Sequence, residues 1–446
     1  MWYKRKIEDY LLRWKETPTH KPLIIKGVRQ CGKTSSVKAF AKAHYKHVVY
    51  LDFHENPEYK QFFHPNLDVN EIILRISATL PSLIIEPYKT CFIFDEIQDC
   101  PMARASLKFF SLDGRYDVLC TGSLLGVNGY KTKEEQKEEE EASIPVGFES
   151  FVTMHPMDFE EWLWANGIRE EHIDVLRKHF QEETPVEPAF HQRFRELLLQ
   201  YVFVGGMPEA VEKFLTTKQV GPLLEVQRQI IDSYEADMVK YARKEDKPRI
   251  RECFESIPRQ LAKENKKFTY AVVRPNGRGK DYTGSLQWIE DAGIIHRCYN
   301  TEITELPLDG NAIQDQFKVY MADTGLFIAM LEDGTASSIL QGNLGAYKGA
   351  IYENLMADIL GKMGRKLYYF HKDSGLEIDF LMRYKGECVL VECKARTGNA
   401  KSTSTVLKHT EKYHVQHAIK IGDYNVGRDG ALLTIPFYMA FLLTEM

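Results

Sequence analysis

Apolar and helical patterns alternate along the first third of the chain. Positions 23–25 and 47–53 are short runs rich in apolar, β-branched or aromatic residues, and 33–43 between them has a helical pattern. Two further runs, 91–94 and 118–120, are apolar at every position, as expected for central strands that are covered on both faces. Strands that alternate with helices predict a parallel sheet with crossover connections.

The pattern changes twice in the remainder of the chain. A helical pattern covers 158–241, and short helical segments then lead to a predicted strand at 294–299. From position 349 onward, one predicted helix precedes β-rich pairs that are separated by turn glycines such as Gly386. This succession predicts a helical middle part and a C-terminal part with both helices and strands.

Composition is that of an ordinary globular protein. Of the 446 residues, 44% are hydrophobic and 27% charged, and this length suggests about three domains of roughly 150 residues each. The formal net charge of -5 argues against nucleic-acid binding over the whole surface. Eight scattered cysteines without CxxC spacing indicate buried thiols in a reducing compartment. We find no signal peptide and no apolar run of membrane-spanning length, and therefore expect a cytoplasmic protein without a membrane partner.

A glycine-rich segment follows the first predicted strand. Residues 27–34 read Gly-Val-Arg-Gln-Cys-Gly-Lys-Thr and match G-x-x-x-x-G-K-[ST], with a strand before and a helix after. The glycines let the backbone curl so that its N–H groups face phosphate oxygens, and the helix N-terminus adds partial positive charge. Lys33 reaches the β- and γ-phosphates, and the Thr34 hydroxyl ligates magnesium. The segment therefore predicts ATP and Mg2+ as ligands.

An acidic pair ends a later apolar strand. Asp95 and Glu96 follow it at the edge where ligands collect in open α/β sheets, so Asp95 would hold magnesium through water and Glu96 would act as general base. Thr121 and Ser123 end a third strand, either beside the γ-phosphate or as an ordinary turn. The residues predicted to contact the nucleotide are Gly27, Val28, Arg29, Gln30, Cys31, Gly32, Lys33, Thr34, Ser35, Thr121 and Ser123.

These motifs resemble a bacterial and archaeal family of AAA-type ATPases that carries a characteristic C-terminal module of unknown function. Beyond the nucleotide motifs, the resemblance rests on the segments 155–162, 205–209, 286–293 and 318–326, and it covers nearly the whole chain. It implies an ATPase core, a helical linker and a winged-helix part.

One feature of many relatives is missing. They carry an arginine in a Gly-Arg pair before the segment that corresponds to 155–162, whereas 144–148 reads Ile-Pro-Val-Gly-Phe here. If that arginine stabilises the transferred phosphate, the resemblance implies that this protein supplies the charge from elsewhere or hydrolyses ATP slowly. Arg104 and Arg115 lie near the site in sequence, but the sequence assigns neither a role.

The region 240–297 is basic in a chain that is acidic as a whole. It contains fourteen Lys and Arg against eight Asp and Glu. Aromatic residues (Phe268, Tyr270 and Tyr282) accompany the charges, and a predicted helix at 284–291 follows. This layout is typical of a turn with a recognition helix that contacts DNA, and equally of a winged helix that contacts proteins. The basic cluster consists of Lys263, Lys266, Lys267, Arg274, Arg278 and Lys280.

A last constellation lies near the C-terminus. Asp379 ends one predicted strand, and Glu392 and Lys394 are two apart in the next, so their side chains leave on one face. With Glu353 on a preceding helix, the set resembles the PD-(D/E)xK nuclease fold. The resemblance implies that Asp379 and Glu392 bind magnesium, that Lys394 activates water, and that Glu353 is an auxiliary ligand. The alternative is a nuclease-like scaffold whose charges are paired in salt bridges.

Together, these patterns predict an α/β chain with a P-loop NTPase (AAA-type) parallel sheet domain, a helical and winged-helix middle, and an α/β nuclease-like C-terminal domain. The expected segments are 1–155, 156–240, 241–335 and 345–446. The leading hypothesis is an ATPase that acts on DNA, with metal-dependent cleavage left open. The alternative is an ATP-dependent switch that binds protein partners or itself, with a catalytically silent nuclease-like domain.

Overall fold

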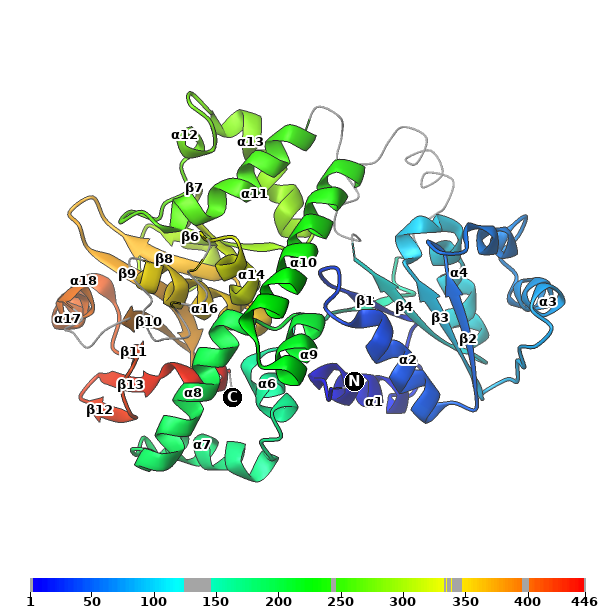
Figure 1. Ribbon diagram of the computed structural model, residues 1–446, viewed down its shortest axis with the longest axis horizontal. Helices are drawn as coiled ribbons and strands as arrows, with labels where there is room; N and C mark the ends of the chain where they lie inside the picture. Colours follow the sequence, from blue (N-terminus) through cyan, green and yellow to red (C-terminus); the bar gives the residue numbers. More distant parts are fainter. Residues whose placement is uncertain are drawn as a thin grey trace. The chain divides into compact units, whose positions relative to one another are not determined.

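Two compact units make up the protein in the computed structural model. The N-terminal unit consists of Lys4–His155 and Asp237–Lys247, and the C-terminal unit consists of Pro156–Ala236 and Pro248–Met446 with the first three residues (Figure 1). Over the part of the chain that the structure describes, every helix is too short or too polar to span a membrane. The structure describes residues 3–123, 146–241, 246–332, 334, 338, 347–394 and 401–444.

A five-stranded parallel sheet forms the centre of the N-terminal unit. Its strand order is β2-β3-β4-β1-β5, so β4 lies between the strand that leads into the glycine-rich loop and the strand that ends in Asp95. Burial on both faces explains why the central residues of β3 and β4 are apolar in sequence. The strands are β1 Leu23–Lys26, β2 His47–Asp52, β3 Thr90–Asp95, β4 Asp117–Gly122 and β5 Ser150–Thr153.

Helices cover this sheet, and local signals in the sequence set several of their ends. The carboxylate of Asp68 caps α3 by accepting from two backbone N–H groups, and α4 begins at Pro101 and ends before Gly114, which has a φ of 66°. The core beneath them is aromatic and includes Phe92 and Phe94. The elements are α1 Lys6–Glu16, α2 Lys33–His44, η1 Pro57–Phe63, α3 Val69–Thr79, η2 Ile97–Asp99 and α4 Pro101–Asp113.

The C-terminal unit opens with a run of helices. The short helix α6 has a capping box in which Asp158 and Glu161 each accept from the other's backbone N–H. The long helix α10 begins in this unit, and its last residues belong to the N-terminal unit. The helices are α6 Phe159–Ala165, α7 Glu170–Glu182, α8 Pro188–Val204, α9 Pro208–Thr217, α10 Val220–Tyr241, α11 Lys247–Leu261, α12 Tyr270–Val273 and α13 Gly279–Asp291.

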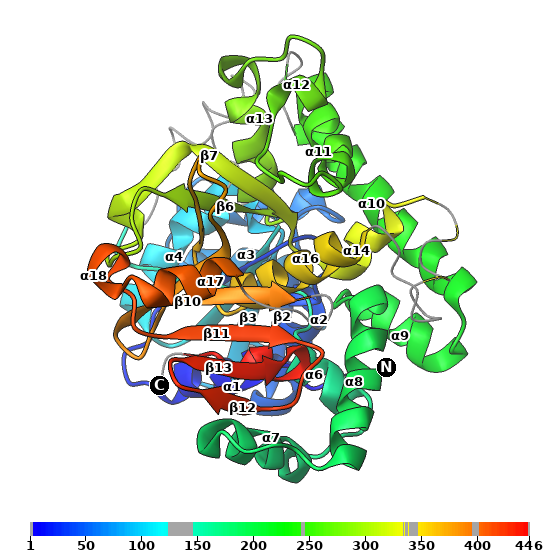
Figure 2. The ribbon, with the colours of Figure 1, turned by 90° about the vertical axis from the view of Figure 1, so that its left-hand side faces the viewer.

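An eight-stranded mixed sheet, in the order β12-β13-β11-β10-β9-β8-β6-β7, forms the rest of this unit. Figure 2 shows β10, β11, β13 and β12 side by side. The strands are β6 Ile295–Thr301, β7 Ala312–Met321, β8 Leu367–His371, β9 Glu377–Tyr384, β10 Glu387–Lys394, β11 Ala418–Gly422, β12 Gly427–Asp429 and β13 Leu432–Pro436. The helical elements are η4 Asp309–Asn311, α14 Thr324–Ala329, α16 Lys348–Lys362, α17 Lys401–Lys408, α18 Thr410–Tyr413 and η6 Phe437–Leu442.

The hairpin of β6 and β7 joins two segments that the sequence pattern separates. Strand β6 pairs with β7 on one side and runs parallel to β8 on the other, with Cys298 opposite Leu367. The expected winged-helix segment 241–335 and the expected nuclease-like segment 345–446 therefore share one continuous sheet. Parallel pairing over this distance in sequence leaves no local signal.

A buried polar node links the helices to this sheet. The N–H of Gly206 donates to Asp323 at 2.6 Å, and the N–H of Met157 donates to the carbonyl of Gly206 at 2.7 Å. A Cβ on Gly206 would lie 2.0 Å from the Met157 carbonyl oxygen, and a Cβ on Gly325 would lie 2.5 Å from that of Val204. Three segments that carry the family resemblance thus meet in one place, where small residues permit close backbone contact.

Candidate functional site

The glycine-rich loop between β1 and α2 contains two residues in the left-handed region. Gln30 has a φ of 64° and Gly32 of 99°, so the chain turns sharply before α2 begins at Lys33. Gly27 lacks a side chain for another reason, because a Cβ there would lie 2.1 Å from the carbonyl oxygen of Met154. The curled loop and the helix N-terminus together provide backbone N–H donors of the kind that bind phosphate.

The side chain of Lys33 folds back over this loop. It is 6% exposed, and its Nζ donates to the carbonyl oxygens of Gly27 and Val28, both at 2.9 Å. The ammonium group therefore places a full positive charge at the loop. Among the other predicted loop residues, Val28 and Cys31 are buried in the unit, and Ser35 is exposed on α2.

Asp95, at the end of β3, accepts hydrogen bonds from three hydroxyl groups. Thr34 Oγ1 lies 3.0 Å from its Oδ1, Thr121 donates to the same oxygen, and Tyr50 OH lies 2.6 Å from Oδ2. Asp95 is 3% exposed, so these donors replace the water that a carboxylate otherwise needs. The structure brings together one residue from the start of α2 and one from each of β2 and β4 around this carboxylate on β3.

Glu96 follows directly and has an unusual backbone conformation. Its φ is 51°, which is uncommon for a residue with a side chain and is typical of residues held at a functional turn. Its Oε2 accepts from Gln98 Nε2 at 2.5 Å and from Ser123 Oγ at 3.3 Å. Glu96, which follows β3, and the hydroxyl of Ser123, which follows β4, therefore lie at the same end of the sheet.

Tyr50 and Asp52, both on β2, belong to none of the sequence motifs. Tyr50, on β2, lies with its OH 2.9 Å from Asp52 Oδ2 as well as 2.6 Å from Asp95. Burial raises the pKa of Tyr50, so the phenol stays protonated and donates. The ammonium of Lys38 lies 3.4 Å from the centre of the Tyr50 ring. In sequence, the available signal was that Tyr50 and Asp52 are two residues apart in a predicted strand. Only the pairing of β2 with β3 shows that they lie beside Asp95.

The arginines near the site are engaged in ion pairs within the N-terminal unit. Arg104 binds Glu149 with Nη2 at 2.6 Å, and Arg115 binds Asp113 with Nη2 at 2.6 Å. Arg29, from the glycine-rich loop, pairs with Asp237. Of the segment that lacks the expected arginine, positions 144 and 145 lie outside the described residues.

This donor set fits a nucleoside triphosphate with a divalent cation. Backbone N–H groups of the curled loop and the ammonium of Lys33 match phosphate oxygens, and the oxygens of Thr34 and Asp95 are the hard ligands that Mg2+ prefers. Glu96 follows Asp95 directly and is a carboxylate of the kind that can take a proton from water.

A second polar cluster lies in the C-terminal unit around Glu353 on α16. Glu353 is 7% exposed, its Oε1 pairs with Lys266, and its Oε2 accepts from Tyr320 OH at 3.0 Å and lies 3.7 Å from Lys318 Nζ. Burial alone would raise the pKa of Glu353, but the ammonium groups of Lys318 and Lys266 bring it below its ordinary value.

The strand residues predicted from the nuclease pattern join the same cluster. Asp379 accepts from the N–H of Cys393 at 2.8 Å, and Glu392 pairs with Lys394 and accepts from Thr403 Oγ1 at 3.0 Å. Burial, together with the charges of Glu353 and Glu392, raises the pKa of Asp379 to about 8. Within the described residues, no group of three or more His, Cys, Asp or Glu side chains is arranged to hold a metal ion.

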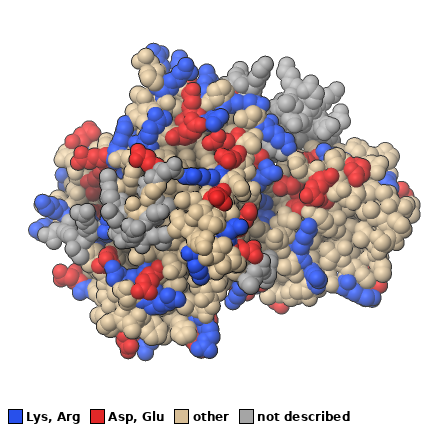
Figure 3. All heavy atoms as spheres, in the orientation of Figure 1, with Lys and Arg blue, Asp and Glu red and all other residues tan. Residues whose placement is uncertain are grey.

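The basic region of the sequence forms an exposed end of the C-terminal unit. Lys and Arg side chains gather over α12 and α13 (Figure 3), and the tight turn before α13 brings Gly277 so close to the Tyr270 carbonyl that a Cβ would lie 2.6 Å from it. Lys267 is partly buried, and Lys266 belongs to the Glu353 cluster. The exposed basic residues are Arg249, Arg251, Arg259, Lys263, Arg274, Arg278 and Lys280.

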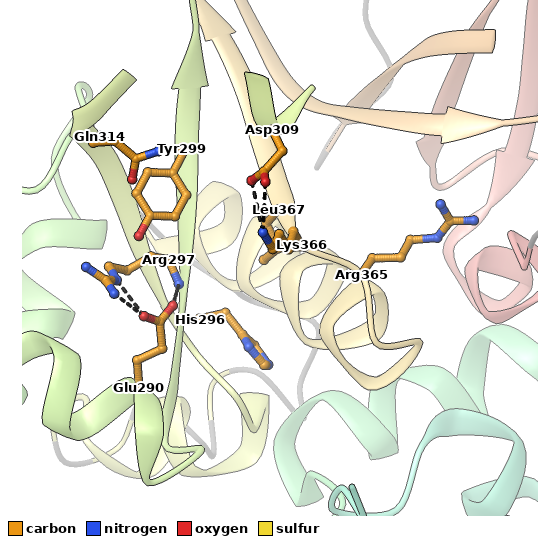
Figure 4. Close-up of a pocket in the computed structure, with 9 residues that line it drawn as sticks. All are labelled: Glu290, His296, Arg297, Tyr299, Asp309, Gln314, Arg365, Lys366 and Leu367. Atoms are coloured by element: carbon orange, nitrogen blue, oxygen red, sulfur yellow. Dashed lines mark hydrogen bonds and ion pairs between the residues drawn. The ribbon is translucent and has the colours of Figure 1, made fainter. Parts of the chain in front are cut away.

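A cavity of about 460 Å³ lies on the C-terminal unit between α13, β6 and the start of β8. Figure 4 shows Glu290 directed at Arg297 and Lys366 directed at Asp309, and Lys366 Nζ lies 3.0 Å from Asp309 Oδ1. Two pairs of opposite charge thus lie in its wall, and the guanidinium of Arg365 donates to the carbonyl oxygens of Arg383 and Leu443. The lining residues are Glu290, His296, Arg297, Tyr299, Asp309, Gln314, Arg365, Lys366 and Leu367.

Three family models match separate parts of the chain. An AAA domain model matches residues 19–163, which include the glycine-rich loop, Asp95 and Glu96. Two domains of unknown function match the rest, DUF8612 over residues 195–337 and DUF4143 over residues 348–438. A comparison with curated proteins gives no match.

Solved structures with partial likeness include archaeal ATPases. A Walker-type ATPase of Pyrococcus abyssi is 14% identical, with 74% of this chain and 96% of that one covered and a TM-score of 0.43. The Aeropyrum pernix ORC1 protein, solved in complex with DNA, is 12% identical, with 76% and 95% covered and a TM-score of 0.29. Such low identities and scores carry no functional conclusion.

The parallel sheet, the curled loop and the AAA domain match agree with one another. The predicted fold class is confirmed: a parallel α/β sheet of the P-loop type, a helical middle and a C-terminal mixed sheet. The N-terminal unit of this chain therefore has a parallel α/β sheet of the P-loop type, and an AAA domain model matches residues 19–163.

Proposed function

We propose that this protein hydrolyses ATP in its N-terminal unit and uses the energy to act on DNA through its C-terminal unit. The observation that carries the first half is the convergence of Thr34, Thr121 and Tyr50 on the carboxylate of Asp95, next to the loop that holds Lys33. A buried carboxylate with hydroxyl donors from three other segments suits a metal-linked phosphate site better than a purely structural contact.

Each residue has a defined part in this proposal. The loop N–H groups and Lys33 bind the phosphates, and Thr34 and Asp95 hold Mg2+, which when bound neutralises phosphate charge. Glu96 takes the proton from the attacking water, and its left-handed backbone, together with Gln98, fixes its direction. Ser123 lies beside Glu96 and orients the same water.

Support for DNA as the target comes from the exposed end of the C-terminal unit. Arg274, Arg278 and Lys280 are exposed on the turn before α13 and on its first residues, and Thr283 on the same helix is also exposed. Exposed basic side chains at the start of a helix are the arrangement that contacts backbone phosphates. These contacts supply affinity and position rather than sequence preference.

The second candidate is an ATP-dependent switch that binds protein partners or other copies of the chain. The observation that favours it is the ion pairing of Glu353 with Lys266 and of Glu392 with Lys394, because paired charges suit a scaffold better than metal-dependent cleavage. Under this candidate, ATP turnover is independent of DNA.

One experiment separates the candidates. ATP turnover and DNA binding are measured for the wild type and for a triple variant, Arg274→Ala, Arg278→Ala and Lys280→Ala. If DNA is the target, the triple variant loses affinity, and the slope of log affinity against log salt falls by about 3. The matched control replaces Lys178, Arg193 and Lys218, exposed basic residues on or next to α7–α9, and should bind as the wild type does. Turnover that ignores DNA, with no binding at low salt, favours the switch.

A further inference from the structure

Lys318 is a buried cation among carboxylates. It lies on β7, its side chain is 1% exposed, and its Nζ is 2.7 Å from Glu377 Oε1 and 3.7 Å from Glu353 Oε2. The same ammonium is 4.8 Å from the centre of the Tyr369 ring. Burial lowers the pKa of a lysine, but the charges of Glu353, Glu377 and Asp379 hold the pKa of Lys318 above its ordinary value. The group therefore stays charged inside the unit.

The neighbouring carboxylates have partners from the chain itself. Lys266, from the segment between α11 and α12, pairs with the other oxygen of Glu353. Asp379 accepts from the backbone N–H of Cys393. Lys394 pairs with Glu392. Three ammonium groups from three different segments thus balance the acidic residues on α16, β9 and β10.

This arrangement does not suit a divalent metal ion. A metal in such a site needs two or more carboxylates turned toward one point, whereas Glu353 is directed at two lysines and Glu392 at a third. A second full positive charge beside Lys318 would also be repelled at close range in a buried setting. The donor set therefore fails the test for the magnesium site that the nuclease resemblance implies.

We propose that Lys318 is the resident cation of this cluster, and that its ammonium group takes the place of a divalent metal. It supplies from within the chain the positive charge that holds Glu353 and Glu377 together. The wild-type cluster consequently binds no divalent metal. This role goes beyond the ATPase and DNA-binding proposals and does not depend on either.

The proposal predicts that removal of the ammonium creates a metal site. In Lys318→Ala, Glu353 keeps Lys266 on one oxygen, but its other oxygen and Glu377 lose the ammonium group between them, and a buried charge that loses its partner is strongly destabilising. We expect the melting temperature to fall by roughly 10 °C. Mn2+ should then restore roughly 5 °C at a hundredfold excess over its Kd, because it binds the folded state alone.

The experiment uses the full chain without nucleotide, in an Asp95→Asn background that removes the carboxylate of the other candidate metal site. Mn2+ binding is followed by electron paramagnetic resonance and unfolding by calorimetry. Lys318→Ala should bind one Mn2+, and the added change Glu353→Gln should abolish that binding. The matched control is Lys366→Ala, an exposed lysine that pairs with Asp309, and it should gain no Mn2+.

Three results would overturn the proposal. The first is Mn2+ bound by the chain with Lys318 intact and lost in Glu353→Gln or Glu392→Gln, which would make the cluster a true metal site. The second is Lys318→Ala that folds and shows no Mn2+ effect. If Lys318→Ala does not fold, Lys318→Met keeps most of the side-chain volume without the charge. The third result is a Lys318→Met variant as stable as the wild type, because it would show that the ammonium charge of Lys318 does not stabilise the neighbouring carboxylates.

Discussion

The phenol of Tyr50 on β2 donates a hydrogen bond of 2.6 Å to Asp95 on β3. The two strands are adjacent and parallel, with Asp52 opposite Asp95, so the phenol spans two carboxylates at one end of the sheet. Thr34 and Thr121 donate to the other oxygen of Asp95, so Tyr50 helps to fix the rotation of the carboxylate from this side. Tyr50 is therefore a positioning residue for the proposed magnesium ligand.

We expect Tyr50→Phe to weaken the apparent affinity for Mg2+ in ATP hydrolysis. Loss of one hydrogen bond to a charged group costs about 1.5–3 kcal/mol, which corresponds to an increase of roughly ten- to a hundredfold in the Mg2+ concentration for half-maximal rate. Titration of ATPase activity with Mg2+ measures this shift. The control is Tyr45→Phe, since Tyr45 donates to Asp117 at 2.5 Å in the same unit and has no contact with Asp95. Equal magnesium curves for both variants would remove Tyr50 from the site.

Lys33 and Glu96 should fail in different ways. Lys33→Ala removes the ammonium at the loop and should abolish measurable nucleotide binding, whereas Glu96→Gln should keep binding and lose at least a hundredfold in turnover, as expected for a general base. Nucleotide titration by fluorescence and single-turnover hydrolysis separate the two effects. A Glu96→Gln protein with normal turnover would show that another group takes the proton.

His20 and Asp117 form a pair whose contribution depends on pH. His20 Nε2 lies 2.9 Å from Asp117 Oδ1, and this hydrogen bond raises the pKa of His20 above 6.5. Burial would raise the pKa of Asp117, but hydrogen bonds from His20 and Tyr45 keep it below 3.8. His20 makes its full contribution to the free energy of unfolding below the pKa that it has in the unfolded chain. This contribution is lost as pH rises through the pKa of His20 in the folded protein. Asp117 contributes to the free energy of unfolding until pH falls through its lowered pKa in the folded protein.

His20→Gln should therefore destabilise the protein at pH 5.5–6 and have a smaller effect at pH 8.5. The expected difference between the two conditions is about 1 kcal/mol, because the pair is partly buried. Urea unfolding of wild type and variant at both pH values measures it. A variant whose loss of stability grows toward alkaline pH would contradict the assignment.

Gly206→Ala should be strongly destabilising. The new Cβ would lie 2.0 Å from the Met157 carbonyl oxygen, so either the N–H bond to Asp323 or the backbone contact must break, at a cost of at least 2 kcal/mol. Gly221→Ala is the matched control in helix α10, where an added Cβ meets no atom within 4 Å. That change should stabilise by about 0.5–1 kcal/mol. Chemical denaturation of both variants provides the comparison, and equal stabilities would refute the role of the node.

The sequence by itself determined the elements whose signals are local. Residues 27–34 dictate a curled loop because Gly27 and Gly32 occupy positions that other residues do not tolerate, and the structure has the loop between β1 and α2 as expected. Asp95 and Glu96 follow a short uninterrupted apolar run that favours a buried strand, and the structure has β3 there, ending at Asp95. In both cases, a few neighbouring residues determine which chemical groups are present and in which element they lie.

Tertiary structure alone decided which distant groups share a site. Tyr50 joins Asp95 through the order of strands in the sheet, and Lys318 faces Glu353 because β6 and β7 extend the C-terminal sheet beyond the expected domain boundary. The pattern of apolar positions fixes which face of a strand is buried, but not which strand lies beside it. The neighbouring strand supplies the partner of a buried charge, and this is why the sequence predicted Lys394, which lies two residues from Glu392, but not the roles of Lys318 and Lys266.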